Sequence, residues 1–193
     1  MSPTTAFLAA LRAVLPDEPG LAVIHSSFAK LVPPSDFEPR HAVRALATLA
    51  REGWTLALPA FTFSFCGTGE FDLRTTPSET GALADWVLRM APGAQRSRHP
   101  IYSFVFLGPG APELAQLEGE TVFGPGSVFE RFEQDDAAFV MLGCGWTYNT
   151  QFHRYEELAQ VPYRYFKRFD GHCCGEECSA DMYVRDLDID PAN

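Results

Sequence analysis

Two short apolar runs enclose a helical pattern near the N-terminus, and this arrangement constrains the fold more than any other feature of the chain. The runs are Leu21–Ile24 and Trp54–Leu58. Between them, Ser35 and Glu38 form a Ser-x-x-Glu capping box, which predicts the start of a helix. The helix continues to Gly53 through an apolar stripe made of Ala42, Leu46, Leu49 and Ala50. Strand, helix and strand in this order form a βαβ unit with parallel strands and a right-handed crossover. The sequence therefore predicts an α/β fold.

The other expected elements follow in one uninterrupted series. Helices are expected at residues 4–15, at 82–89 and from Ser127, and strands at 101–106 and 138–142. Two more strands, at 162–169 and 182–187, flank a cysteine-rich turn and predict a C-terminal hairpin. No linker, repeat or low-complexity segment divides the chain, so we expect one domain over residues 1–193.

The chain is acidic. It has 15 Lys and Arg residues against 25 Asp and Glu residues, which gives a net charge of −10 at neutral pH. A field of this sign repels phosphate backbones and attracts cations, which argues against nucleic acid and for a polycationic or amine-bearing small molecule. Solubility alone also accounts for such a charge.

Neither a membrane span nor an export signal is expected. No apolar run approaches the roughly 18 residues that a membrane helix needs. The first residues carry no basic region, and Arg12 interrupts the apolar patch that follows. We therefore expect a cytoplasmic protein.

The five cysteines raise the questions of disulfides and of metal. Five is an odd number, and without an export signal reduced thiols are expected rather than a disulfide framework. The candidate zinc ligands His172, Cys173, Cys174 and Cys178 lie within seven residues. Adjacent cysteines seldom both reach one tetrahedral ion, and no second pair closes the site. A turn between strands is therefore favoured over a metal site, and no metal is expected.

His153 and Glu156 are candidates for acid–base chemistry. They follow the strand expected at 138–142, and residues three apart share one face of a helix. An imidazole beside a carboxylate is suited to act as a general base. The spacing is short and common, so on the pattern alone the start of a surface helix is the favoured explanation.

Two polar turns are candidate ligand-binding segments. His25–Phe28 follows the first strand at the end where α/β sheets place their ligand crevices, so it either binds an oxyanion or an amide chain or only caps a helix. Arg96–Pro100 gathers two arginines and a histidine before a proline, which suits either an anion site or a salt-bridge hub.

Taken together in this order, the segments resemble the aminoglycoside 3-N-acetyltransferase family, which are antibiotic N-acetyltransferases distinct from the GNAT group. The matching segments are residues 25–28, 58–62, 71–72 with 76–81, 96–100 with 103–104, 108–109, and 149–156 with 162–164. The ordered set, rather than any one motif, is specific. The resemblance implies an α/β/α three-layer core with a largely parallel central sheet. It also implies acetyl-CoA as the donor, an amine as the acceptor, and a role in antibiotic resistance.

The resemblance further implies roles for individual residues. His153 matches the catalytic histidine, a general base that deprotonates the acceptor amine in direct transfer. Glu156 matches the acidic residue after that histidine, which either orients it or binds the ammonium group of the acceptor. Asp72 and Glu157 are assigned to the acceptor. The residues assigned to acetyl-CoA are Ser26, Ser27 and Phe28 beside the pantetheine, and Arg96, Ser97, His99 and Ser103 near its other end.

Two departures from the family leave the acceptor open. Leu73 and Arg74 follow Asp72 where the family usually has proline, and family members usually continue beyond Asn193 with a distal part that walls the acceptor site. The acceptor site here is then more open, completed by a partner chain in a homo-oligomer, or adapted to another acceptor. One alternative function is an acyltransferase for an amino sugar or natural-product amine, with CoA or a carrier protein as donor. The other is a non-catalytic binding protein on the same fold.

Overall fold

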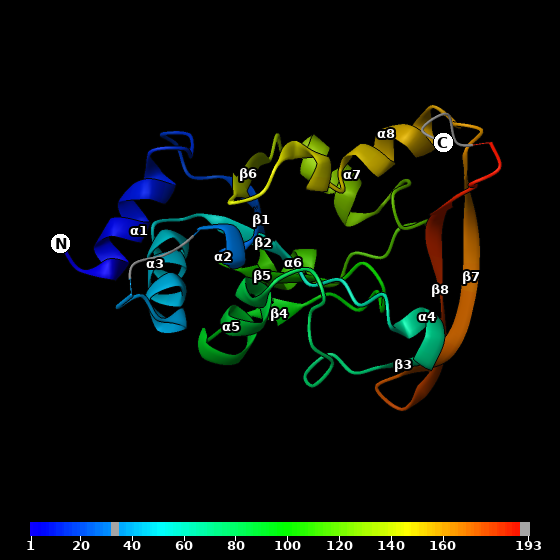
Figure 1. The fold of residues 1–193 in the computed structure, drawn as a ribbon, viewed down its shortest axis with the longest axis horizontal. Helices are drawn as coiled ribbons and strands as arrows, with labels where there is room; N and C mark the ends of the chain where they lie inside the picture. Colours follow the sequence, from blue (N-terminus) through cyan, green and yellow to red (C-terminus); the bar gives the residue numbers. More distant parts are fainter. Residues whose placement is uncertain (32–34, 190–193) are drawn as a thin grey trace.

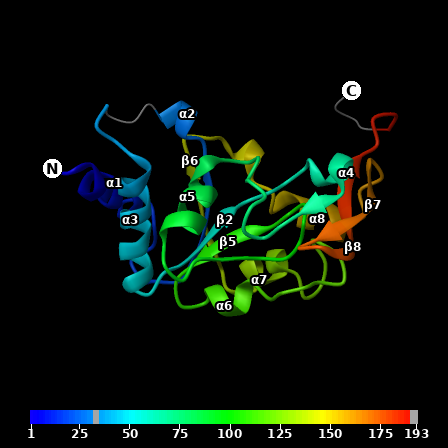
Figure 2. The same ribbon diagram turned by 90° about the horizontal axis from the view of Figure 1, so that it is seen from below.

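The structure is a computed structural model that describes residues 1–31 and 35–189. A five-stranded sheet in the order β4-β5-β2-β1-β6 forms its centre, and a three-stranded sheet in the order β3-β7-β8 stands at one end (Figures 1 and 2). The strands are β1 (Leu21–Ser26), β2 (Thr55–Pro59), β3 (Glu70–Phe71), β4 (Gln95–Arg96), β5 (Phe104–Leu107), β6 (Ala138–Leu142), β7 (Arg164–Cys173) and β8 (Glu176–Arg185). The helices are α1 (Pro3–Arg12), α2 (Phe28–Leu31), α3 (Pro39–Arg51), α4 (Phe65–Thr68), α5 (Ala82–Met90), α6 (Ala111–Leu114), α7 (Val128–Gln134) and α8 (Phe152–Leu158), with a 3-10 turn η1 (Trp146–Tyr148).

The predicted βαβ unit is confirmed. Strands β1 and β2 are parallel and α3 connects them. The helix begins at Pro39, however, so the predicted cap at Ser35 is wrong. Glu38 is the N-cap residue, and His41 Nδ1 accepts a hydrogen bond from its N–H at 2.9 Å. A residue before proline favours extended backbone, and proline suits the first helical position, which together fix the helix start here.

The central sheet is mixed, so the prediction of a largely parallel sheet is wrong. The β1–β2 and β1–β6 pairs are parallel, whereas the β2–β5 and β4–β5 pairs are antiparallel. The chain crosses over through α5 into β4, which runs in the same direction as β2. The turn at 97–103 then reverses the chain and inserts β5 between β4 and β2.

Helices cover both faces of the central sheet, which confirms the three-layer arrangement. Successive strand residues point to opposite faces, so Ala22 and Ile24 pack toward α1, α3 and α5, while Val23 packs with α6 and α7. Phe104 and Phe106 of β5 continue the second core, where they meet buried side chains of α7. Because both faces of the central sheet are buried, each of these strands is a continuous apolar run in the sequence.

The C-terminal hairpin is confirmed. Strands β7 and β8 pair antiparallel over their whole length and stand at the end of the molecule opposite α1 (Figure 1). Strand β3 pairs parallel to β7 and joins the hairpin to the body. In the described part of the chain, no helix is long and apolar enough to cross a membrane.

Cys173 and Cys178 form a disulfide near the hairpin turn, so the expectation of reduced thiols is wrong for this pair. Cys174 and Gly175 both have positive φ and make the two-residue turn that brings the strands together. The two Cα atoms lie 5.7 Å apart, a usual separation for a bridge. Over the described residues, no group of three or more His, Cys, Asp or Glu side chains is arranged to hold a metal ion.

Candidate active site

His153 and Glu156 touch each other on α8. The His153 Nδ1 to Glu156 Oε2 distance is 2.6 Å, and both side chains are partly buried. Strand β6 occupies the predicted residues 138–142, and η1 then leads into the helix, so the strand delivers the pair to this end of the sheet. The i, i+3 spacing therefore produces a contact rather than only a shared helix face.

A third residue, Arg164 of β7, completes this cluster. Its Nε lies 2.8 Å from Glu156 Oε2, and the Tyr163 hydroxyl donates to Oε1 at 3.4 Å. Burial raises the pKa of Glu156, but the hydrogen bonds from His153 and Arg164 outweigh it and hold that pKa below its ordinary value. Glu156 is therefore an ionised carboxylate at neutral pH.

The imidazole of His153 lies between two aromatic rings. Phe123 and Tyr183 approach it edge to face, with centroid distances of 5.4 and 6.3 Å. Burial lowers the pKa of His153, against the opposing effect of its hydrogen bond to Glu156. The imidazole is therefore neutral at pH 7. Since an ionised carboxylate only accepts hydrogen bonds, Nδ1 carries the proton and Nε2 keeps a lone pair.

The serines expected beside acetyl-CoA lie at the carboxyl end of β1. Ser26 and Ser27 are partly exposed, and no described side chain engages either hydroxyl. A Cβ on Gly81, which begins α5 at φ +142°, would meet the Ser26 carbonyl oxygen at 3.1 Å, so the helix start and the strand end are closely packed. Phe28 instead packs against Trp86, with a centroid distance of 4.8 Å.

Arg96 and Ser103 are internal hydrogen-bonding residues. The Arg96 guanidinium is buried and donates to the Ala60 and Thr76 carbonyls, to Thr62 Oγ1 and to Ser103 Oγ. Ser103 is fully buried and its hydroxyl donates to the Ala60 carbonyl at 2.7 Å. These partners of Arg96 are neutral oxygens, so its contacts in the described part of the chain make it a hydrogen-bonding hub and not the salt-bridge hub that was one of the two alternatives. A direct contact of these two residues with acetyl-CoA stays a prediction.

Ser97 and His99 line a cavity of about 400 Å³ between the β4–β5 turn, residues 117–122 and the hairpin. The Ser97 hydroxyl accepts from the Phe104 N–H, and His99 Nδ1 accepts from the N–H groups of Ile101 and Tyr102. Burial lowers the pKa of His99 to about 4, so it is neutral. His153 and Glu156 do not line this cavity. The His153–Glu156 pair therefore lies outside the walls of this cavity.

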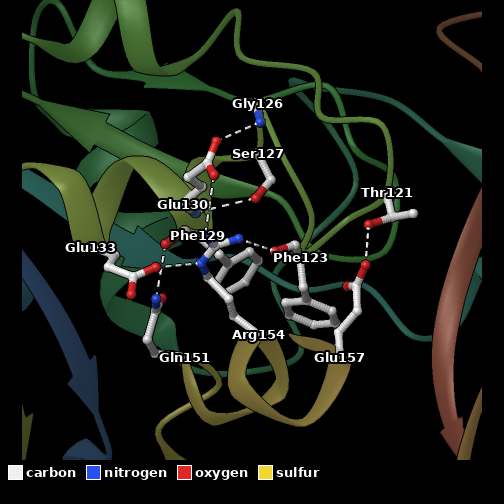
Figure 3. A network of polar contacts seen from close by, with 10 residues as sticks. All are labelled: Thr121, Phe123, Gly126, Ser127, Phe129, Glu130, Glu133, Gln151, Arg154 and Glu157. Carbon is white, nitrogen blue, oxygen red and sulfur yellow. Dashed lines mark hydrogen bonds and ion pairs between the residues drawn. The ribbon is translucent and has the colours of Figure 1, made fainter. Parts of the chain in front are cut away.

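The two carboxylates assigned to the acceptor lie apart in the chain. Asp72 Oδ1 accepts from the N–H groups of Arg74 and Thr75, and these bonds lower its pKa. Glu157 follows Glu156 on α8 but points elsewhere, with Oε1 accepting from the Thr121 hydroxyl at 2.6 Å (Figure 3). Contact of either residue with an acceptor stays a prediction.

The model of one protein family, described as aminoglycoside 3-N-acetyltransferase, matches residues 23–192. The chain belongs to this family. Its enzyme class is therefore aminoglycoside N-acetyltransferase, and the family resemblance seen in the sequence is confirmed.

Individual members of the aminoglycoside 3-N-acetyltransferase family show the extent of the likeness. Aminoglycoside N(3)-acetyltransferase IV of Salmonella sp is 29% identical over 191 residues, which cover 88% of this chain and 70% of that protein. Aminoglycoside N(3)-acetyltransferase IX of Micromonospora chalcea is 34% identical over 100 residues, 51% of this chain and 35% of that one. The crystal structure of aminoglycoside acetyltransferase AAC(3)-IVa superposes with a TM-score of 0.77 at 26% identity, over 93% of this chain and 69% of that chain.

Within this family fold, four contributors to the His153 cluster carried no assigned role in the sequence, and they are Phe123, Tyr163, Arg164 and Tyr183. Arg164 and Tyr163 lie in a segment that matches the family, 162–164, and that adjacency to the histidine motif was the available signal. Phe123 gave no signal, because its Gly- and Pro-rich surroundings predict only a turn.

Proposed function

We propose that this aminoglycoside N-acetyltransferase moves an acetyl group from acetyl-CoA directly to an amino group of an aminoglycoside, with His153 as general base. The observation that carries the proposal is the 2.6 Å contact between His153 Nδ1 and ionised Glu156. This contact fixes the ring and leaves Nε2 as the basic atom. Arg164 holds the carboxylate from its other side.

The chemistry requires such a base. An aminoglycoside amine is mostly protonated at pH 7 and cannot attack until it loses a proton. His153 Nε2 takes a proton from the ammonium group, and the resulting neutral amine nitrogen forms a bond to the thioester carbonyl carbon. The carbon–sulfur bond then breaks, and the thiolate of CoA leaves and takes the second proton that this nitrogen releases.

The end of β1 is the donor side of this proposal. Ser26 and Ser27 offer two hydroxyls that no described side chain engages, beside the start of α5, where backbone N–H groups and the helix dipole favour negative charge. Such donors suit a phosphate or the developing thioester oxyanion. A protein of the same fold, AAC-IIIb, has been solved with CoASH, at a TM-score of 0.78 and 20% identity. The family resemblance assigns Phe28, Arg96, Ser97, His99 and Ser103 to the same donor, and their contact with acetyl-CoA stays a prediction.

The acceptor side rests on charge. AAC(3)-IVa has been solved with apramycin and with a gentamicin, at 25% and 26% identity to this chain. An aminoglycoside carries several amino groups, and the net charge of −10 attracts polycations. Asp72 Oδ2 accepts no hydrogen bond from the described residues and Glu157 lies on the helix of His153, so both are assigned to ammonium groups.

A thiol-release assay tests the proposal. Acetyl-CoA is incubated with the protein and a panel that includes apramycin, gentamicin, simple amino sugars and an amine-free sugar. We expect CoA release with aminoglycosides only, and a loss of roughly 10²- to 10⁴-fold in His153→Ala. His172→Ala, in the exposed hairpin tip, is the matched control. Full turnover in His153→Ala would remove His153 from the mechanism, and release with amino sugars alone would reassign the acceptor.

A further inference from the structure

Helix α8, which carries His153, presents its apolar side chains to solvent and its polar side chains to the protein. Phe152, Tyr155 and Leu158 are 52%, 45% and 57% exposed. Arg154, one turn from Gln151, is 5% exposed and faces inward (Figure 3). A surface helix ordinarily buries its apolar stripe. Polar contacts rather than apolar burial therefore hold this helix in place.

Arg154 makes the central contacts. Its Nε lies 2.6 Å from Glu133 Oε2 and its Nη2 lies 3.1 Å from Glu130 Oε1, both on α7. Its Nη1 donates to the Phe123 carbonyl at 2.7 Å. A planar guanidinium bound in three directions has a fixed position and orientation, which Lys reproduces only in part.

Two further contacts hold the ends of the same helix. At its start, Gln151 Nε2 donates to the Phe129 carbonyl at 2.8 Å, and at its end Glu157 accepts from Thr121 at 2.6 Å. The three inward residues Gln151, Arg154 and Glu157 follow at intervals of three (Figure 3). The helix is thus fixed to residues 121–133 at its start, middle and end.

Phe123 connects the contacts of Arg154 to the imidazole of His153. Its carbonyl oxygen accepts from Arg154, while its ring packs edge to face against His153. We propose that Arg154 is a positioning residue for His153, which holds α8 so that the imidazole stays between Phe123 and Tyr183 and in contact with Glu156. The proposal rests on the proposed function of His153 as the base.

Loss of the Arg154 contacts has a defined electrostatic effect on His153. The charged and titratable groups facing the imidazole are Glu156 on its own helix, Arg164 on β7, and Tyr183 and Arg185 on β8. Burial has the largest effect on the imidazole, so a helix that shifts toward water raises the pKa of His153 toward its ordinary value. A displacement of about 1 Å also costs on the order of 10²-fold in rate.

The test compares Arg154→Met, Arg154→Lys and Arg131→Met. Arg131 is the matched control, because it lies on α7 and binds two carboxylates, Glu113 and Asp135, without contacting α8. The His153 titration is followed by NMR in the protein without substrates, and kcat and KM are measured with acetyl-CoA and an aminoglycoside. In Arg154→Met we expect the midpoint of the His153 titration to lie at a higher pH than in wild type. We also expect kcat to be at least tenfold lower than in wild type, with KM for acetyl-CoA within about twofold of the wild-type value. Arg154→Lys should recover part of the loss, and Arg131→Met should behave as wild type.

A folded Arg154→Met protein with an unchanged His153 titration and unchanged kcat would overturn the positioning role. If Arg154→Met does not fold, the Glu130→Gln and Glu133→Gln double variant weakens the same contacts, and its titration and kcat must shift in the same direction or the proposal fails. If His153→Ala keeps full turnover while Arg154→Met still moves the His153 titration, the base assignment fails and the positioning role stands.

Discussion

Arg164 on β7 lies 2.8 Å from the carboxylate of Glu156 on α8 and so joins the hairpin to the helix that carries His153. The carboxylate is bound from both sides, by an imidazole and by a guanidinium. The Glu156 carboxylate is therefore held in place and stays ionised. The hairpin thus contributes to the orientation of His153.

Glu156→Gln should lower kcat/KM by about 10- to 100-fold, as loss of an orienting partner does elsewhere. The carboxylate raises the pKa of His153, so its loss lowers that pKa further and moves the acidic limb of the pH–rate profile to lower pH. A pH series of initial rates measures both effects. Glu18→Gln, at an exposed site before β1, is the control. An acidic limb that moves to higher pH would contradict the assignment.

Ser26→Ala with Ser27→Ala should separate a binding role from a structural one. No side chain among the described residues engages either hydroxyl, so we expect KM for acetyl-CoA to rise several-fold while the free energy of unfolding stays within about 0.5 kcal/mol of wild type. Ser103→Ala should instead destabilise by about 1–3 kcal/mol, because it removes the hydrogen-bond acceptor of the buried Arg96 Nε, while the Ala60 carbonyl keeps its bond from Arg96. Steady-state kinetics measure KM for acetyl-CoA, and urea unfolding measures the free energy of unfolding of each variant. An unchanged KM in the double variant argues against the donor site.

Reduction of the Cys173–Cys178 disulfide should lower the free energy of unfolding by about 2 kcal/mol, the value for a short closed loop. Urea unfolding with and without reductant measures the loss. Cys173→Ser should reproduce it, whereas Cys174→Ser, at the exposed free cysteine, should not. A thiol titration that finds five free thiols in the untreated, unfolded chain would show that the bridge is absent.

His25 should make the protein sensitive to acid. Burial lowers its pKa from 6.5 to about 4 in the folded chain. Between these values the unfolded chain binds a proton that the folded chain does not, so the free energy of unfolding falls as the pH falls from 6.5 to about 4. Urea unfolding at several pH values gives the slope of the free energy of unfolding against pH. In His25→Gln this slope should be smaller than in wild type by up to about 1.4 kcal/mol per pH unit. His99 acts in the same direction, so part of the slope remains. Ser26→Ala must keep the wild-type slope.

Elements that depend on local pattern could be predicted from the sequence. Strand β6 has the predicted bounds, and the predicted cap Ser127 is the N-cap residue of α7, where its hydroxyl accepts from the Glu130 N–H. The direction of β5 could not be predicted, because its apolar pattern is the same for a parallel and an antiparallel neighbour. The disulfide was missed because it depends on the register of β7 against β8, which no local pattern contains.

At the candidate site, the His153–Glu156 contact follows from helical spacing, but the inward polar face of α8 does not. Sequence periodicity places residues on faces of a helix without saying which face is buried. The usual rule would bury Phe152 and Tyr155, which are exposed, and expose Arg154, which is buried. The partners of Arg154 on α7 lie more than twenty residues earlier in the chain.

The position of β1 between β2 and β6 determines the order in which the fold can be completed. Residues 22–26 pair with residues 138–142, so one edge of β1 has no partner until more than a hundred further residues have been synthesised. An apolar strand with an open edge is prone to pair with other chains during that interval. The helix that carries His153 follows β6 through η1, so it is synthesised only after the strand that pairs with this edge of β1.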